Sequence, residues 1–262
     1  MKSIDLYYFS GTGNTILVVE KLIEIFLKNN IKINALKMES SKPEEVDTDK
    51  TIGLAFPVAM QSTYPFIWDF INSLPGTNDT EIFMIDTLHA FSGAIVGPLK
   101  KVLIKKGYNP IGAKEIIMPN NFRNKINSEK DKEIIKKGLK DAEDYAYTLI
   151  NKNAKWKNIP FFPHLFYFLV SRRFLWNFIK KMGSKFRVDH TSCTKCRICF
   201  EICPVNNIEM PDYPGHKNRC QFCMRCVMFC PTEAISVPLI KVKRYRSVNI
   251  DKIKKNLFQP DQ

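Results

Sequence analysis

The sequence predicts an α/β protein with a doubly wound sheet of five parallel strands, followed by a small α+β domain near the C-terminus. Three observations support this assignment. Apolar, strand-like runs alternate with amphipathic helical patterns through residues 1–152. A short loop of glycines and hydroxyl residues follows the first of these runs. All 8 cysteines lie between residues 193 and 230.

Positive charge is concentrated in the part of the chain that holds the cysteines. The 262 residues carry a formal net charge of +14, of which residues 1–158 contribute +3 and residues 159–262 contribute +11. The positive electrostatic potential of this region favours an acidic protein partner, an anionic membrane surface or nucleic acid. Charge alone does not distinguish between these three partners.

No segment has the pattern of a secretory signal or of a membrane span. The longest apolar stretch, 159–170, is interrupted by Pro160, Pro163 and His164, whereas a spanning helix needs about 20 apolar residues. Together with the many cysteines, which stay reduced inside the cell, this predicts a cytoplasmic protein.

The first predicted strand, 4–9, leads into a loop that is suited to a phosphate group. The loop residues are Ser10, Gly11, Thr12, Gly13, Asn14 and Thr15. A helical pattern follows from Ile16, so backbone N–H groups and a helix N-terminus point at the loop. The lysine of a P-loop is missing, and Ile16 stands where a dinucleotide fingerprint needs its third glycine. Glu39 could imitate the ribose-binding acid of that fingerprint, but it does not replace the glycine. Hydroxyls without a counter-ion suit a phosphate monoester that is held permanently.

The remaining elements of the first domain alternate in the same way. Strands are predicted at 31–37, 51–57, 81–87 and 112–118. Helices are predicted at 64–74, 93–106 and 128–151, with a loop or short helix at 40–49. Sheets of this class bind ligands beyond the carboxyl ends of the first and third strands. The candidate site is therefore where the loops 10–15, 57–64 and 87–93 meet.

One cysteine pattern, C-x2-C-x2-C-x3-C-P, occurs twice. Its members are Cys193, Cys196, Cys199 and Cys203 in the first run, and Cys220, Cys223, Cys226 and Cys230 in the second. Zinc sites use two C-x2-C pairs rather than two triplets with a trailing cysteine. Disulfide frameworks are typical of short secreted chains. The pattern instead resembles that of bacterial two-cluster ferredoxins, in which the fourth cysteine of each run ligates the other cluster.

This resemblance implies two [4Fe–4S] clusters with crossed ligand sets. One cluster is expected on Cys193, Cys196, Cys199 and Cys230. The other is expected on Cys220, Cys223, Cys226 and Cys203. The segments after Pro204 and Pro231 also correspond, and each places an isoleucine, Ile208 or Ile235, where it would cover a cluster. The two runs are thus predicted to form an internal repeat.

The loop at 10–15 after a strand is similar to the FMN-phosphate loop of flavodoxins. With the motif Phe56-Pro57-Val58, the turn 118–121 and the cysteine runs, most of the chain resembles the EFR1-type iron–sulfur flavoproteins. These join a flavodoxin-like domain to a C-terminal two-[4Fe–4S] ferredoxin domain. The resemblance implies bound FMN, with cofactor-binding residues Ser10, Gly11, Thr12, Gly13, Asn14, Thr15, Pro57, Val58, Ala59, Thr87, Leu88 and His89.

The third loop departs from this group, which usually carries a glycine pair there. Here the loop runs from Thr87 to Gly93 through a leucine, a histidine and a phenylalanine. Tyr64, His89 or Phe91 could stack on the flavin ring, and each is equally plausible as loop packing.

Four segments are expected: a flavodoxin-like FMN-binding domain at 1–152, an aromatic-rich bridge at 153–187, a ferredoxin domain at 188–238 and a basic tail at 239–262. Residues 153–158 are expected to be a linker, and 159–182 a helical pair that packs the two domains together. The alternative for 159–182 is peripheral membrane contact through its aromatics. The tail is expected to be a solvated basic edge.

The predicted function is intracellular electron transfer between the clusters and FMN, with an acidic ferredoxin- or flavodoxin-like redox protein as partner. One alternative is a flavin-dependent reductase of a small organic or quinone-like acceptor. Another is a redox-sensing module that binds nucleic acid through the tail. No nucleophile–base pair or paired carboxylate is evident, so no catalytic residue is assigned.

Overall fold

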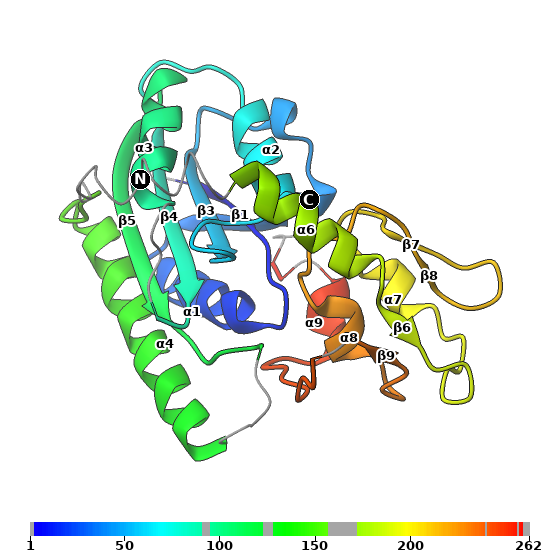
Figure 1. Cartoon of the computed structure of the whole chain (residues 1–262). Helices are drawn as coiled ribbons and strands as arrows, with labels where there is room; N and C mark the ends of the chain where they lie inside the picture. Colours follow the sequence, from blue (N-terminus) through cyan, green and yellow to red (C-terminus); the bar gives the residue numbers. More distant parts are fainter. Residues whose placement is uncertain are drawn as a thin grey trace.

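The computed structural model describes residues 3–90, 95–122, 128–156, 172–238, 240–255 and 257–258, with only the backbone for 172–175. Its N-terminal half is a sheet with helices on both faces, and the C-terminal half is a small domain packed beside the sheet (Figure 1). The predicted α/β class with a second, α+β domain is confirmed.

The five strands are parallel and lie in the order β2-β1-β3-β4-β5, the flavodoxin-like doubly wound order. Their bounds are β1 Ser3–Tyr8, β2 Lys32–Lys37, β3 Thr51–Pro57, β4 Glu81–Leu88 and β5 Asn109–Ile117. The fifth strand begins three residues before the predicted Gly112. It includes Pro110, which is tolerated because β5 is an edge strand and the β4–β5 register shifts beside it.

The helices match the predicted pattern where the structure describes them. They are α1 Asn14–Lys28, α2 Pro65–Ser73, α3 Val96–Lys105 and α4 Ser128–Ile150, with short 3-10 turns at Met38–Ser40 and Pro43–Glu45. The predicted start of the third helix, at residue 93, lies outside the described residues.

Alternating residues of the strands supply two separate cores. In β1, Leu6 and Tyr8 pack with α1 and α4, whereas Tyr7 and Phe9 pack on the other face with α2 and α3. Because successive side chains of a strand point to opposite faces, a strand buried on both faces is apolar throughout. This burial accounts for the apolar residues that predicted β1. The exception, Asp5, is 4% exposed and pairs with Lys50 at 3.1 Å.

The C-terminal domain is built from short elements in two similar halves. These are β6 Arg187–Val188, α7 Ile198–Glu201, β7 Ile208–Glu209, β8 Gly215–His216, α8 Arg225–Phe229 and β9 Ile235–Ser236. β6 pairs with β9 and β7 with β8, both antiparallel. Ile208 and Ile235 are both buried, as the predicted internal repeat requires.

Helix α6, Arg172–Gly183, connects the two domains. Its Trp176 and Ile179 are buried in the core that also contains Tyr64 and Trp68 of the sheet domain. At its other end, a Cβ on Gly183 would lie 2.4 Å from the Cys220 sulfur. The helix therefore packs against both domains. The helical pair expected at 159–182 stays a prediction, because residues 159–171 lie outside the described part.

Two expectations about connecting segments are wrong. The linker expected at 153–158 is, as far as residue 156, packed on the sheet domain: Trp156 is 6% exposed and its indole N–H donates to the Val96 carbonyl at 2.9 Å. The C-terminal tail is not a solvated edge either. It contains α9, Ile250–Lys254, with Ile253 only 2% exposed, and Ala35 of β2 donates to the Phe258 carbonyl at 3.0 Å.

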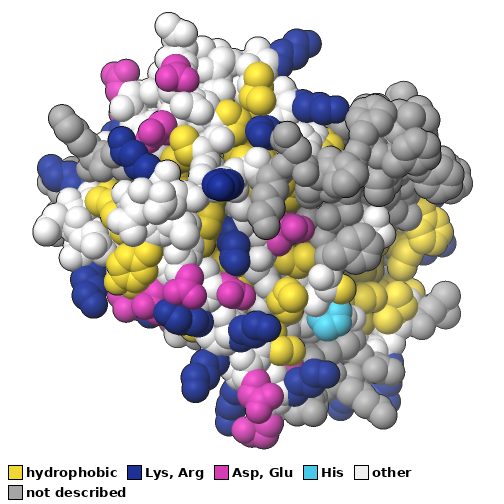
Figure 2. Space-filling model, turned by 90° about the vertical axis from the view of Figure 1, so that its left-hand side faces the viewer, with side chains coloured by type: hydrophobic (Ala, Val, Ile, Leu, Met, Phe, Trp, Pro, Cys, Tyr) yellow, Lys and Arg dark blue, Asp and Glu magenta, His cyan; other side chains and the backbone are white. Residues whose placement is uncertain are grey.

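None of the helices in the described ranges has both the length and the apolar character that a membrane span requires. Figure 2 shows the side of the molecule that carries β5 and α4, where basic and acidic side chains are interspersed. This mixture agrees with the small net charge of residues 1–158.

A buried ion pair joins the two domains. Arg225, in the second cysteine loop, lies 2.7 Å from a carboxylate oxygen of Glu39, and their side chains are 4% and 9% exposed. The same guanidinium donates to the Ser10 carbonyl at 2.8 Å and the Ile202 carbonyl at 3.2 Å, and it covers the Phe9 ring. Glu39 thus has a structural partner rather than a ribose to bind.

Removing one partner of this pair should leave a buried charge without compensation. We expect Glu39→Leu to lower the free energy of unfolding by about 3 kcal/mol, and the double variant Glu39→Leu, Arg225→Met to recover much of that loss. Denaturant unfolding of the cluster-loaded protein under anaerobic conditions measures both. Glu44→Gln, at an exposed position, is the control and should change little. An equal loss in the single and double variants would contradict this account of the interface.

Candidate functional site

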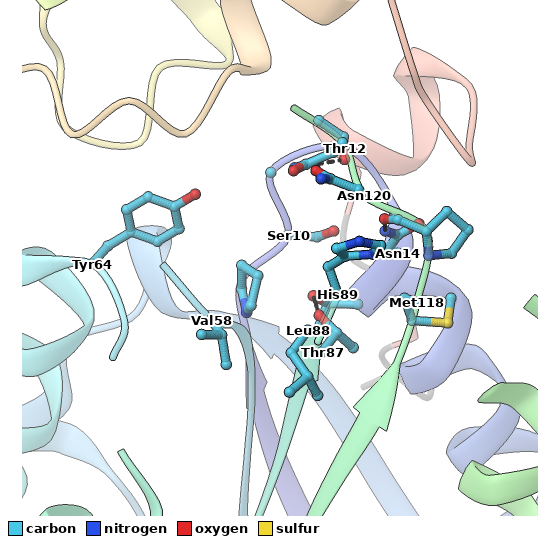
Figure 3. A pocket seen from close by; sticks show the side chains of 15 residues that line it. Ser10, Thr12, Asn14, Val58, Tyr64, Thr87, Leu88, His89, Met118 and Asn120 are labelled. Carbon is cyan, nitrogen blue, oxygen red and sulfur yellow. Dashed lines mark hydrogen bonds between the residues drawn. The ribbon is translucent and has the colours of Figure 1, made fainter. Parts of the chain in front are cut away.

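The three predicted loops meet in one pocket at the carboxyl ends of the strands. Of the expected cofactor-binding residues, ten line it: Ser10, Gly11, Thr12, Asn14, Thr15, Pro57, Val58, Thr87, Leu88 and His89. The other lining residues are Tyr64, Met118, Pro119, Asn120 and Asn121. Figure 3 shows Tyr64 at one side of this pocket and Asn14 and Met118 at the other, with Ser10, Val58 and His89 between them.

Two of the expected residues do not line this pocket. Gly13 has φ of +111°, and a Cβ there would lie 2.5 Å from the Ser247 hydroxyl of the tail. The position is therefore restricted to glycine by its backbone and by the tail. Ala59 lines a neighbouring cavity instead.

Hydrogen bonds hold the hydroxyls of the first loop in place. The Gly13 N–H donates to the Ser10 hydroxyl at 3.1 Å, and the Asn121 side chain donates to the Thr12 hydroxyl at 3.2 Å. In both bonds the hydroxyl oxygen accepts, so its hydrogen can point to a ligand. The Thr15 and Thr87 hydroxyls lie 2.8 Å apart. This set of hydroxyls at the start of α1 fits a phosphate group.

The C-terminal tail braces the outer side of the same loop. The Tyr245 hydroxyl donates to the Asn14 side-chain carbonyl at 2.7 Å, and the Ser247 N–H donates to the Thr12 carbonyl at 3.0 Å. These tail contacts were missed because nothing in the sequence of the basic tail relates it to a loop more than 200 residues away.

The pKa values of the buried thiols indicate which cysteines are neighbours. The pKa of Cys199 is raised to about 11, first by burial and then by Cys196, Cys230 and Cys193. Burial also raises the pKa of Cys223 to about 12, with Cys203 and Cys220 as the neighbouring thiols. In each case one of the neighbouring thiols is the fourth cysteine of the other run, as crossed ligand sets would require.

Both cysteine loops share one backbone conformation. Lys195 and Arg197 in the first loop have positive φ, and so do Phe222 and Met224 at the same positions in the second. Left-handed residues turn successive N–H groups inward. In agreement, the Phe222 N–H donates to the Cys220 sulfur at 3.4 Å and the Asn207 N–H to the Cys203 sulfur at 3.2 Å. N–H groups aimed at sulfur fit iron–sulfur clusters, whose potentials depend on such bonds.

The thiols are spread rather than focused on one point. Within the described ranges, no three His, Cys, Asp or Glu side chains converge as the ligands of a single metal ion do. An iron–sulfur cube, by contrast, takes its thiolates at separate corners.

The second cysteine loop touches the phosphate-type loop. A Cβ on Gly11 would lie 2.7 Å from the Cys223 carbonyl oxygen, so the two backbones are in contact. Across the pocket from this loop, Tyr64 is 7% exposed. Burial raises the pKa of its hydroxyl, and the nearby Cys223 and Cys220 thiols contribute smaller effects in the same direction. The pocket and the second group of cysteines are therefore neighbours.

Comparisons with known proteins agree with the two halves. Residues 186–209 and 214–236 match the family model of the 4Fe-4S binding domain. The C-terminal domain is a 4Fe–4S binding domain. Because such clusters exchange electrons, the general function of the protein is electron transfer.

Solved flavodoxins align with the N-terminal half at low similarity. A short-chain flavodoxin associated with a non-canonical PDU bacterial microcompartment is 14% identical, with 59% of this chain and 100% of that chain covered and a TM-score of 0.44. The flavodoxin of Megasphaera elsdenii is 19% identical, with 52% and 98% covered and a TM-score of 0.39. The sheet order, rather than these similarities, establishes the fold.

The close approach of the two loops can be tested with matched glycine substitutions. Gly11→Ala should force the second cysteine loop away from the pocket and destabilise the protein by about 1–3 kcal/mol. Gly76→Ala should be tolerated, because a Cβ there lies 3.8 Å from its nearest neighbour. Thermal unfolding and limited proteolysis of both variants provide the measurement. Equal stability of the two would show that the loops do not need this contact.

Proposed function

We propose that the protein transfers electrons between two [4Fe–4S] clusters and an FMN bound in the pocket of the sheet domain. The observation that carries the proposal is the contact between Gly11 of the pocket and Cys223 of the second cysteine loop. It places a candidate flavin site directly beside a candidate cluster site. Membership of the EFR1-type iron–sulfur flavoproteins is part of this proposal.

The chain's own residues would hold the flavin phosphate by hydroxyls and backbone N–H groups. Ser10, Thr12 and Thr15 supply the hydroxyls, each less than 3% exposed. Asn14 and Thr15 begin α1, and the first N–H groups of a helix have no partner within it, so they are available to a phosphate. FMN, when bound, exchanges one or two electrons, whereas each cluster exchanges one. The pair can therefore connect one-electron partners to a two-electron step.

The two clusters would lie in series. Cys220, Cys223, Cys226 and Cys203 form the group beside the pocket, and Cys199 of the first group is close enough to Cys226 to raise its pKa. The first group is the outer one, since Cys196 is exposed. We infer that electrons pass between a partner and the first cluster, then the second cluster, then the flavin.

Cofactor content tests the proposal directly. Protein purified under anaerobic conditions should contain about eight irons, about eight sulfides and one FMN per chain. Cys203→Ala should lose the cluster beside the pocket and retain about four irons. Iron, sulfide and flavin assays with the visible spectrum measure this. Clusters without flavin, even after reconstitution with FMN, would overturn the proposed flavin site.

The basic cluster-bearing half suggests the class of partner. Residues 159–262 carry a net charge of +11 before any cluster is bound, so we propose an acidic redox protein as the physiological partner. Charge attraction between exposed groups is screened by salt.

Electron exchange with an acidic ferredoxin should therefore slow by about tenfold or more between low and high ionic strength. Stopped-flow spectra of the clusters, mixed with the reduced ferredoxin, give the rate. A basic cytochrome serves as the control partner and should not show this slowing. A rate with the acidic partner that is independent of ionic strength would contradict the proposed partner class.

A further inference from the structure

A second cavity adjoins the candidate flavin site on the side of Tyr64 and Val58. It shares the lining residues Val58, Tyr64 and Asn121 with the first pocket, so the two cavities are immediate neighbours. Most of its other lining residues are large and apolar: Met60, Phe122, Trp176, Ile179, Phe222 and Met224.

The composition of this cavity differs from that of the first pocket. Its walls are aromatic or aliphatic, and none of the described residues that line it is charged. Its polar side chains are the amides of Asn121 and Gln221, apart from the Tyr64 hydroxyl. The Gln221 side-chain carbonyl accepts the Phe66 N–H at 3.1 Å, which holds this amide in place. Such walls suit a flat, uncharged, largely apolar ring system with a few polar atoms at its edge.

We propose that the isoalloxazine ring of the flavin occupies this cavity, held between the sheet domain and the second cysteine loop. The inference rests on the proposed function and extends it. Phosphate capture at Ser10–Thr15 fixes one end of the cofactor, and the adjoining apolar space receives the other. Trp176 and Ile179 of α6 and Phe222 and Met224 of the cysteine loop, which lie outside the sheet domain, thereby become ring contacts.

The aromatic walls are already fixed before a ring enters. Tyr64 and Trp176 have ring centroids 6.0 Å apart, and Phe122 and Phe222 lie 5.7 Å apart at 65°. Tyr64, Trp176 and Met224 are at most 8% exposed. Walls that are held by their own contacts do not lose side-chain freedom when they bind a ring.

One side of the cavity is open. Met60 is 46% exposed and Phe122 is 38% exposed, so these two residues form its rim. The cavity is also lined by Phe222 and Met224, the neighbours of Cys223 in the sequence. The ring would therefore face the second cluster on its inner side and solvent only at the rim.

Paired titrations with FMN and riboflavin separate the ring site from the phosphate site. The full chain, with its clusters and stripped of flavin, is titrated under anaerobic conditions by following flavin fluorescence. Trp176→Ala and Phe122→Ala should each weaken FMN and riboflavin alike, by about tenfold. Ser10→Ala should weaken FMN by about tenfold and leave riboflavin unchanged, because riboflavin has no phosphate.

Matched variants control for damage to the fold. Phe178→Ala removes an aromatic ring from the same helix, but Phe178 is 56% exposed and does not line the cavity, so both flavins should bind as in the wild type. Trp176→Phe should recover most of the affinity lost in Trp176→Ala. Cluster absorbance confirms that each variant keeps its clusters.

The outcomes distinguish this inference from the function on which it rests. Wild-type affinity for both flavins in Trp176→Ala and Phe122→Ala, with FMN still weakened by Ser10→Ala, would overturn the ring site and leave the phosphate site intact. A wild-type protein that binds neither flavin would overturn the proposed function, and the ring site with it.

Discussion

The interface between the two domains depends on the position of the buried Arg225. One guanidinium binds a carboxylate at the end of β2, a carbonyl in the pocket loop and a carbonyl of the cluster-binding domain. A cation this deeply buried is stable only while all these partners stay in place. Movement of either domain would leave a charge without compensation, so the interface has one favourable arrangement.

This arrangement explains why the pocket and the cysteines are close together. Arg225 is two residues after Cys223, and Ser10 precedes Gly11, so the bond between Arg225 and Ser10 brings those two neighbours together. An electron-transfer protein gains from such rigidity, because little has to reorganise when charge moves. Helix α6 adds a second connection. Its Trp176 packs in the core of the sheet domain, and its Gly183 contacts Cys220 of the cluster-binding domain.

Local patterns predicted most of the fold. Buried parallel strands are largely apolar, so β1 and β3 were evident from sequence. The resemblance of the cysteine runs to ferredoxins implied two groups that exchange a member. The pocket loops could be predicted because the switch point of a doubly wound sheet is set by strand order. Each of these features depends on residues that are near in sequence or on a general rule of topology.

Contacts between distant segments could not be predicted in the same way. Glu39 and Arg225 are ordinary charged residues in the sequence, and only their burial at one interface makes them partners. The tail has the composition of a solvated edge, yet Tyr245 and Ile253 are buried. The walls contributed by Trp176 and Phe222 to the second cavity also depend on how the domains pack, for which no local signal exists.

The pairing of the tail with β2 affects how readily the protein associates with other molecules through the edge of its sheet. β2 is an edge strand of the sheet, and unpaired edges can recruit strands from other molecules. The bridge between Ala35 and Phe258 covers part of that edge, and Lys37 donates to the carbonyls of Ile253 and Lys254 to keep α9 there. Residues 250–258 thus leave less of the β2 edge open to pairing with a strand of another molecule.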